Sequence, residues 1–116
     1  MSRRQEKVAA LLQQQAAVVL SREFAVKNVV LSVVRVDVSP DLKNARVHVS
    51  IVGSEPAGLR DRLENALPGL MAKNLARRTD LRSIPHLRIV FDDSSAYAKR
   101  MSNLIDSASI RLTQQP

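Results

Sequence analysis

The sequence of 116 residues predicts an α+β fold in which helices cover one face of a three-stranded sheet. Three stretches alternate apolar and polar side chains with the period of two that half-buried strands have. Around them, apolar residues recur at steps of three and four, the pattern of an amphipathic helix. No internal repeat is present, and the chain is long enough to bury a core without disulfides. We therefore expect one domain over residues 1–112 and a short tail over residues 113–116.

The first predicted helix starts after Ser2, which forms a capping-box pattern with Gln5. Its apolar stripe consists of Val8, Leu11, Leu12, Ala16, Val19, Leu20 and Phe24. Arg3 and Arg4 fall in the first turn, where their charge opposes the helix dipole. They either hold phosphate or belong to a solvated helix end.

A hairpin follows, because two alternating segments flank the turn Ser39-Pro40-Asp41. The residues expected to face the helices are Val34, Val36 and Val38, then Ala45, Val47, Val49 and Ile51. The residues expected to face outward are Arg35, Asp37, Arg46, His48 and Ser50, joined by Arg88 and Val90 if the third segment pairs in the same sheet.

A second helical period runs through Leu59, Leu63, Ala66, Leu67, Leu70, Met71 and Leu75. Pro68 interrupts it, and a proline inside a helix costs about 3 kcal/mol, so Leu67-Pro68-Gly69 is predicted to be a kink or a break between two helices. A third strand over residues 87–92 precedes a final helix, which Ser94 caps. Up to the third strand this order, α-β-β-α-kink-α-β, is that of a type II KH-like domain.

Composition narrows the partners of the chain. Lys and Arg number 18 against 11 Asp and Glu, which gives a net charge of +7 and favours nucleic acid or another acidic surface. A merely soluble basic protein is the alternative. Cysteine is absent, which excludes disulfides and cysteine nucleophiles and is compatible with a reducing cytosol. No apolar run approaches the roughly 18 residues that a membrane span needs.

An enzyme is the first rival class, and the titratable residues argue against it. His48 and His86 have no partner at a metal-binding spacing, and Asp92 and Asp93 would face opposite sides of a strand. No phosphate-binding loop, nucleophile elbow or dinucleotide fingerprint is present. We therefore expect no catalytic site, metal, cofactor or small-molecule substrate.

The candidate RNA-binding residues follow the second helical period. They are Lys73, Arg77, Arg78 and Arg82, with Arg46 and Arg88 extending the patch over the open sheet face and Arg3 and Arg4 at the first helix. Arginine offers a planar fork of donors that suits phosphate oxygens. The three aromatic residues Phe24, Phe91 and Tyr97 lie on apolar stripes, so we expect phosphate contacts and RNA shape rather than base stacking to dominate.

Two segments resemble the bacterial ribosome-binding factor A family. One is the hairpin pattern Ser-x-Asp-Leu-x-x-Ala-x-Val, which begins at Ser39. The other is Leu-Arg-x-x-Pro-x-Leu-x-x-x-x-Asp-x-Ser, which begins at Leu81, and Met101-Ser102-Asn103-Leu104 adds to it. The similarity covers roughly residues 3–106.

The resemblance implies a cytoplasmic, non-enzymatic assembly factor. Such a protein binds the free or immature 30S subunit through 16S rRNA, assists late rRNA processing and leaves before translation. The family is also linked to cold adaptation and to release by a GTPase. The alternative is a general RNA- or DNA-binding KH-like adaptor, for instance one that uses the helix pair as a helix-turn-helix. We expect a monomer.

The chain departs from the general KH pattern in one respect and from some relatives in another. A KH domain clamps RNA with a Gly-x-x-Gly loop, which is missing here. The family is similar in replacing that loop with an Ala-x-Gly kink, and Leu67-Pro68-Gly69 stands at that place. The tail is short, so the contacts that a long charged tail would make are not expected.

Overall fold

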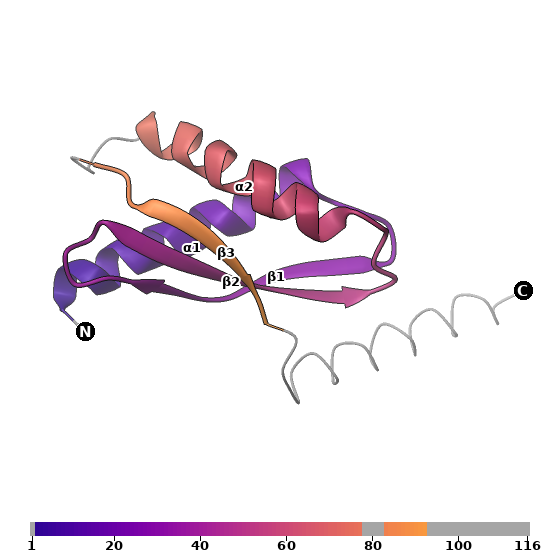
Figure 1. Ribbon diagram of the computed structural model, residues 1–116, viewed down its shortest axis with the longest axis horizontal. Coiled ribbons are helices and arrows are strands. Elements are labelled where there is room, and N and C mark those ends of the chain that lie inside the picture. Colours follow the sequence, from indigo (N-terminus) through magenta and orange to yellow (C-terminus); the bar gives the residue numbers. More distant parts are fainter. Residues whose placement is uncertain (1, 78–82, 93–116) are drawn as a thin grey trace, which may run out of the picture.

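The computed structural model describes residues 2–77 and 83–92. The elements follow in the order α1 (Arg3–Glu23), β1 (Val29–Val38), β2 (Asn44–Gly53), α2 (Leu59–Ala76) and β3 (His86–Phe91) (Figure 1). β2 is the central strand, antiparallel to β1 and parallel to β3. The predicted α+β class and three-stranded sheet are thus confirmed. The predicted final helix after Ser94 and the tail over residues 113–116 lie outside the described residues.

α1 begins as the sequence predicts. The Gln5 N–H donates to Ser2 Oγ at 3.1 Å, and the Ser2 N–H donates to Gln5 Oε1 at 2.8 Å, which completes the capping box. Gln5 does more than cap the helix, because its Nε2 donates to the carbonyl of Val38 at 2.9 Å. This bond ties the start of α1 to the end of β1.

The hairpin turn also follows the prediction. Ser39 Oγ donates to Asp41 Oδ1 at 2.6 Å, and the Lys43 N–H donates to the same oxygen at 3.0 Å. The Asn44 N–H donates to Ser39 Oγ at 3.0 Å. The Ser39 hydroxyl, and next the Lys43 amide, lower the pKa of the Asp41 carboxyl because they stabilise its charged form.

A β-bulge in β1 corrects one predicted core position. The register with β2 shifts between Val33 and Arg35, so Val34 is an extra residue without a partner on β2. Val34 is 40% exposed, and its predicted inward position is wrong. The bulge changes the phase of the alternation: Val33 contacts the core before it, whereas Val36 and Val38 are buried after it.

The outer face of the sheet, which points away from the helices, is less exposed than predicted. His48 and Ser50 of β2 alternate with the inward side chains, as expected, but both are buried. His48 Nε2 lies 2.8 Å from Asp37 Oδ2, and Arg35 Nε lies 3.5 Å from that oxygen. His48 lies between its register partners Arg35 of β1 and Val90 of β3, and these neighbouring strands shield its side chain.

Pro68 does not divide α2 into two helices. The structure shows one helix over Leu59–Ala76, so the predicted pair is wrong. The apolar stripe continues on both sides of the proline, and Leu63, Leu67 and Met71 are fully buried. Burying a leucine side chain contributes about 1.5–3 kcal/mol, so packing of this stripe offsets the local cost of Pro68. The bend itself stays a prediction.

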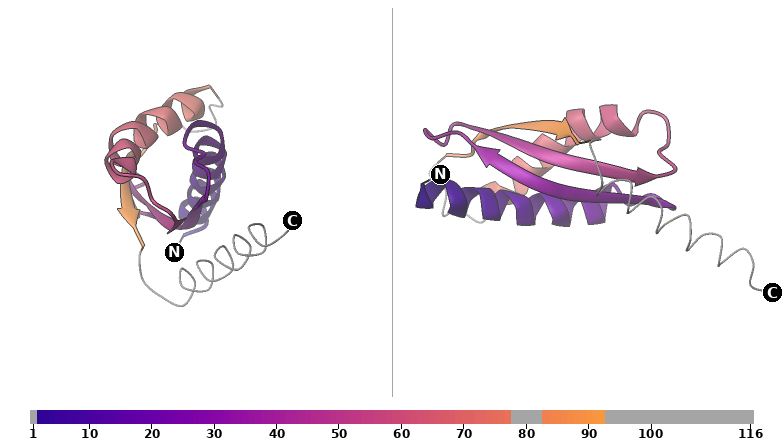
Figure 2. Two further views of the ribbon diagram at one scale, coloured as in Figure 1. Left: turned by 90° about the vertical axis from the view of Figure 1, so that its right-hand side faces the viewer. Right: turned by 90° about the horizontal axis from the view of Figure 1, so that it is seen from below.

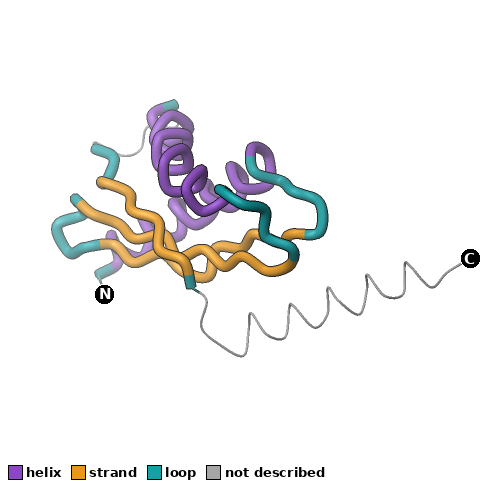
Figure 3. Tube along the Cα trace, turned by 45° about the vertical axis from the view of Figure 1, so that its right-hand side comes forward, coloured by secondary structure: helices purple, strands orange, loops and turns teal. Residues whose placement is uncertain are grey.

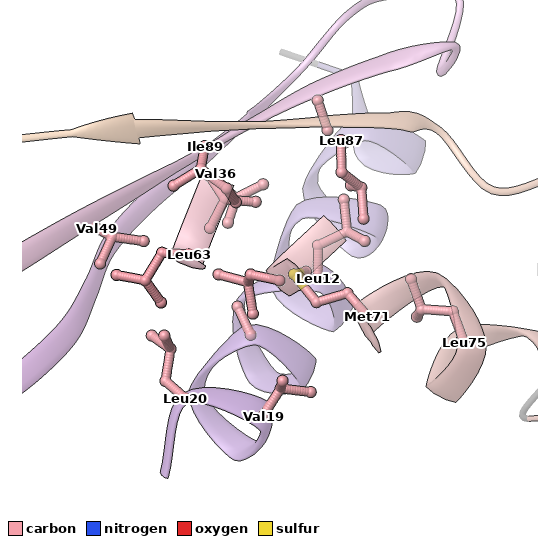
Figure 4. Close-up of a cluster of buried hydrophobic side chains, with 14 of the residues drawn as sticks. Leu12, Val19, Leu20, Val36, Val49, Leu63, Met71, Leu75, Leu87 and Ile89 are labelled. Carbon is pink, nitrogen blue, oxygen red and sulfur yellow. The ribbon is translucent and has the colours of Figure 1, made fainter. Parts of the chain in front are cut away.

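One hydrophobic core joins the two helices and the inner face of the sheet. Leu12 and Leu20 of α1 and Leu63 of α2 meet Val49 of β2 and Ile89 of β3 in a single cluster (Figure 4). The two helices and the sheet enclose this core together (Figure 2). The helices thereby fix the positions of the loops and strand ends that surround the core.

Candidate nucleic-acid interface

The topology brings five chain segments to one end of the molecule. The Gln5 bond to Val38 places the start of α1 beside the end of β1. The His86 N–H donates to the carbonyl of Lys43 at 2.8 Å, which places the start of β3 beside the hairpin turn. The C-terminal end of α2 leads toward the start of β3 and completes this end (Figures 1 and 3).

All six predicted RNA-binding residues that the structure describes belong to these segments. We call the following exposed residues the basic end: Arg3, Arg4, Lys43, Arg46, Lys73, Arg77 and Arg88. They come from α1, the hairpin, α2 and β3, which are far apart in the sequence. Arg78 and Arg82, which we also predict to bind RNA, lie outside the described residues.

The basic end has two faces rather than one continuous patch. Arg46 and Arg88 are register partners on β2 and β3, and both alternate with buried residues, so they lie on the outer face of the sheet. Lys73 and Arg77 lie at the end of α2, in the helical layer. The structure thus brings the two predicted groups to one end but does not merge them.

Arg35 and Lys43 are two further exposed cations, which we did not predict to bind RNA. Arg35 lies on the outer face beyond the bulge, where its side chain is 63% exposed and pairs with Asp37. Asp37 is in turn the register partner of Arg46. Lys43 stands at the tip of the hairpin, next to His86. The alternation marks Arg35 as outward, but only the register shows which charges lie beside it.

A groove between α2 and β3 is the other feature that the sequence did not reveal. Its volume is about 430 Å³, and residues 64, 65 and 68 of α2 and 86–89 of β3 line it. Arg88 belongs both to this groove and to the basic end. The groove depends on the packing of a helix beside an edge strand, which no local pattern encodes.

The described residues include no candidate metal site. Within residues 2–77 and 83–92, no group of three or more His, Asp or Glu side chains could hold a metal ion. The carboxyl of Asp41, whose pKa is lowered, bonds within the hairpin turn. Among the described helices, none is long and apolar enough to cross a membrane.

Comparison with protein families shows which family the chain belongs to. Residues 4–105 match the family described as ribosome-binding factor A. The chain belongs to this family. A ribosome-binding factor A from Akkermansia muciniphila is 33% identical over 117 residues, covering 100% of this chain and 93% of that protein. One from Coxiella burnetii is 37% identical over 109 residues, covering 93% and 92%.

Solved structures agree with the family match. The crystal structure of ribosome-binding factor A from Thermus thermophilus has a TM-score of 0.56 at 23% identity, over 74% of this chain and 93% of that one. A model of the Thermus factor fitted into a cryo-electron microscopy map of a 30S complex has a TM-score of 0.55 at 26% identity, over 75% and 94%. The predicted family is confirmed, and with it the class of non-enzymatic ribosome assembly factors.

Proposed function

We propose that this protein binds the free or immature 30S ribosomal subunit through 16S rRNA and assists its late processing and maturation in the cytoplasm. The observation that carries the proposal is the basic end, where exposed cations from four segments of the chain gather. The Thermus relative, whose model was fitted into a map of a 30S complex, supports the choice of partner.

The basic end suits the rRNA backbone. Lys and Arg side chains neutralise phosphates, and Arg46 and Arg88 stand side by side on the outer face at a spacing set by strand pairing. Lys73 is in the last turn of α2 and Arg77 is its C-cap residue, four positions further on in αR conformation, so they extend from the same side of the helix end. Contacts of this kind position a protein on RNA without reading the sequence. We assign the same role to Arg3 and Arg4, and to Arg78 and Arg82 beyond the described residues.

We propose that this chain binds rRNA without a Gly-x-x-Gly clamp, which its sequence lacks. In our proposal, Leu67-Pro68-Gly69 bends α2 at the place where other KH domains carry that loop. We also propose that the chain acts as a monomer with one domain over residues 1–112, since both described helices cover the same core.

Co-sedimentation tests the proposal directly. The purified protein would be spun with free 30S subunits, with mature 70S ribosomes and with duplex DNA of equal phosphate content. We expect recovery with the free 30S subunits and little with the other two. Equal binding to all three polyanions would support the general nucleic-acid adaptor instead.

A charge-reversal pair locates the surface. Lys73→Glu with Arg77→Glu should abolish most 30S binding, because it replaces two cations of the basic end with anions. Arg22→Glu with Lys27→Glu is the matched control, since it changes net charge equally at the other end of α1. A larger loss of 30S binding in the Lys73/Arg77 variant than in the control, with unchanged circular dichroism in both, would support the basic end as the binding surface. Equal loss would show that only net charge matters.

A further inference from the structure

Among the residues of β1, β2 and β3, a single one is acidic: Asp37 of β1. It lies on the outer face of the sheet as the register partner of Arg46, and Arg46 is in turn the register partner of Arg88 on β3. Neighbouring strands are about 4.8 Å apart, so one carboxylate stands in a short row with two exposed arginines. A negative charge at this position weakens the attraction of the outer face for phosphate.

The carboxylate of Asp37 is held in place by a buried neighbour. His48 Nε2 lies 2.8 Å from Asp37 Oδ2, and because a carboxylate only accepts hydrogen bonds, this nitrogen donates. The His48 side chain is 9% exposed, so packing within the sheet fixes the position of the donor. Arg35 Nε lies 3.5 Å from the same oxygen. A buried donor and an exposed cation thus share one carboxylate oxygen.

The three arginines of the sheet differ in their partners. Arg35 pairs with Asp37, whereas within residues 2–77 and 83–92 no ion pair within 4.0 Å involves Arg46 or Arg88. The Arg35 side chain is 63% exposed, and exposed pairs of this kind are weak. A phosphate that reaches the outer face can therefore compete with Asp37 for the guanidinium of Arg35.

We infer that Arg35 is a further phosphate-binding residue of the outer face and that Asp37, held by His48, restrains it. The inference rests on the proposed RNA-binding function and adds a residue that limits the affinity. In the free protein, Asp37 pairs with the guanidinium of Arg35. In the complex, a phosphate oxygen displaces that carboxylate and is repelled by its charge. This competition favours release of the protein from RNA.

The substitution Asp37→Asn tests this assignment, because asparagine keeps an oxygen that accepts from His48 and removes only the charge. Co-sedimentation with free 30S subunits, titrated at several salt concentrations, would measure the affinity of the wild type, Asp37→Asn and Asp61→Asn. Asp61 is an exposed acid in the first turn of α2, so its variant is the matched control for net charge. Unchanged circular dichroism would show that both variants fold.

We expect Asp37→Asn to bind free 30S subunits about two- to fivefold more tightly than Asp61→Asn, the range for loss of one exposed ion pair. Its log affinity should also fall more steeply with log salt, by about 0.7–0.9 in slope, because one further cation is left to neutralise a phosphate. Equal affinity and equal slope in the two variants would overturn the role of Asp37.

Arg35→Gln tests the other half of the assignment. Alone it should weaken binding to free 30S subunits, and in its background Asp37→Asn should no longer tighten binding. An unchanged affinity of Arg35→Gln, or a gain from Asp37→Asn of the same size in both backgrounds, would overturn the assignment of Arg35 and leave 30S binding by the wild type intact. Failure of the wild type to bind free 30S subunits would overturn the proposed function itself.

Discussion

The substitution Gln5→Glu separates the two roles of this buried side chain, which caps α1 and joins α1 to β1. A glutamate keeps the oxygen that accepts from the Ser2 N–H, so the capping box survives. It loses the Nε2 group that donates to the Val38 carbonyl at 2.9 Å, and it places a carboxylate oxygen against that carbonyl. Only the bond between helix and sheet is removed.

The expected loss is about 1–3 kcal/mol of the free energy of unfolding at neutral pH, the cost of leaving a buried acceptor without its partner. Gln5 is 9% exposed, so water replaces the lost bond poorly. A protonated carboxyl can donate to the Val38 carbonyl, so the deficit relative to wild type should narrow as pH falls. Urea denaturation followed by circular dichroism at several pH values measures both effects.

Gln13→Glu is the matched control, because Gln13 is exposed on the same helix and the change in charge is identical. A surface substitution of this kind usually stays within about 0.5 kcal/mol. If Gln5→Glu lowers the free energy of unfolding no more than Gln13→Glu does, or if its deficit is the same at every pH, the bond between α1 and β1 does not stabilise the fold and the reasoning fails.

Three further predictions concern the core, the turn and the RNA contact. Leu63→Ala should lower the free energy of unfolding, measured by urea denaturation, by about 2–5 kcal/mol, because Leu63 is fully buried. Val34→Ala at the exposed bulge should lower it far less. Similar losses in the two variants would contradict the assignment of the core. Asp41→Asn should destabilise the turn at neutral pH. The pKa of Asp41 is lowered in the folded state, so its contribution to stability is present above the pKa of the unfolded state and is lost as pH falls through the pKa of the folded state. The melting temperatures of the variant and the wild type should therefore converge in acid. A difference in melting temperature that is the same at every pH would refute this. If about five phosphates are neutralised, log affinity for RNA should fall with log salt at a slope of about −3.5 to −4.5, and a flat dependence would exclude phosphate contacts.

The local patterns of the sequence predicted most of the individual elements. The capping box at Ser2 and Gln5 and the turn at Ser39 to Asp41 form as expected, because each needs only residues a few positions apart. The period of two predicted the inward side chains of β2, which is the central strand. Family membership followed from residues that are likewise local in sequence.

The same patterns failed where long-range packing outweighs a local preference. The bulge at Val34 depends on pairing with β2, and nothing in β1 alone marks it. Pro68 carries a real local cost, yet one helix continues through it because the buried stripe holds both halves against the same core. Burial of His48 likewise depends on its neighbours in the sheet rather than on its own alternation.

By itself, then, the sequence determined the fold class, the basic character and the family, since periodicity, charge and motif spacing can all be read along the chain. Tertiary structure alone decided which charges share a surface. Arg46 and Arg88 became neighbours through a parallel pairing between segments about forty residues apart, and Glu64 and Arg88 came to line one groove between a helix and an edge strand. Such arrangements depend on strand register and helix packing. Both are set by how all the core residues pack together, so no short segment of the sequence determines them.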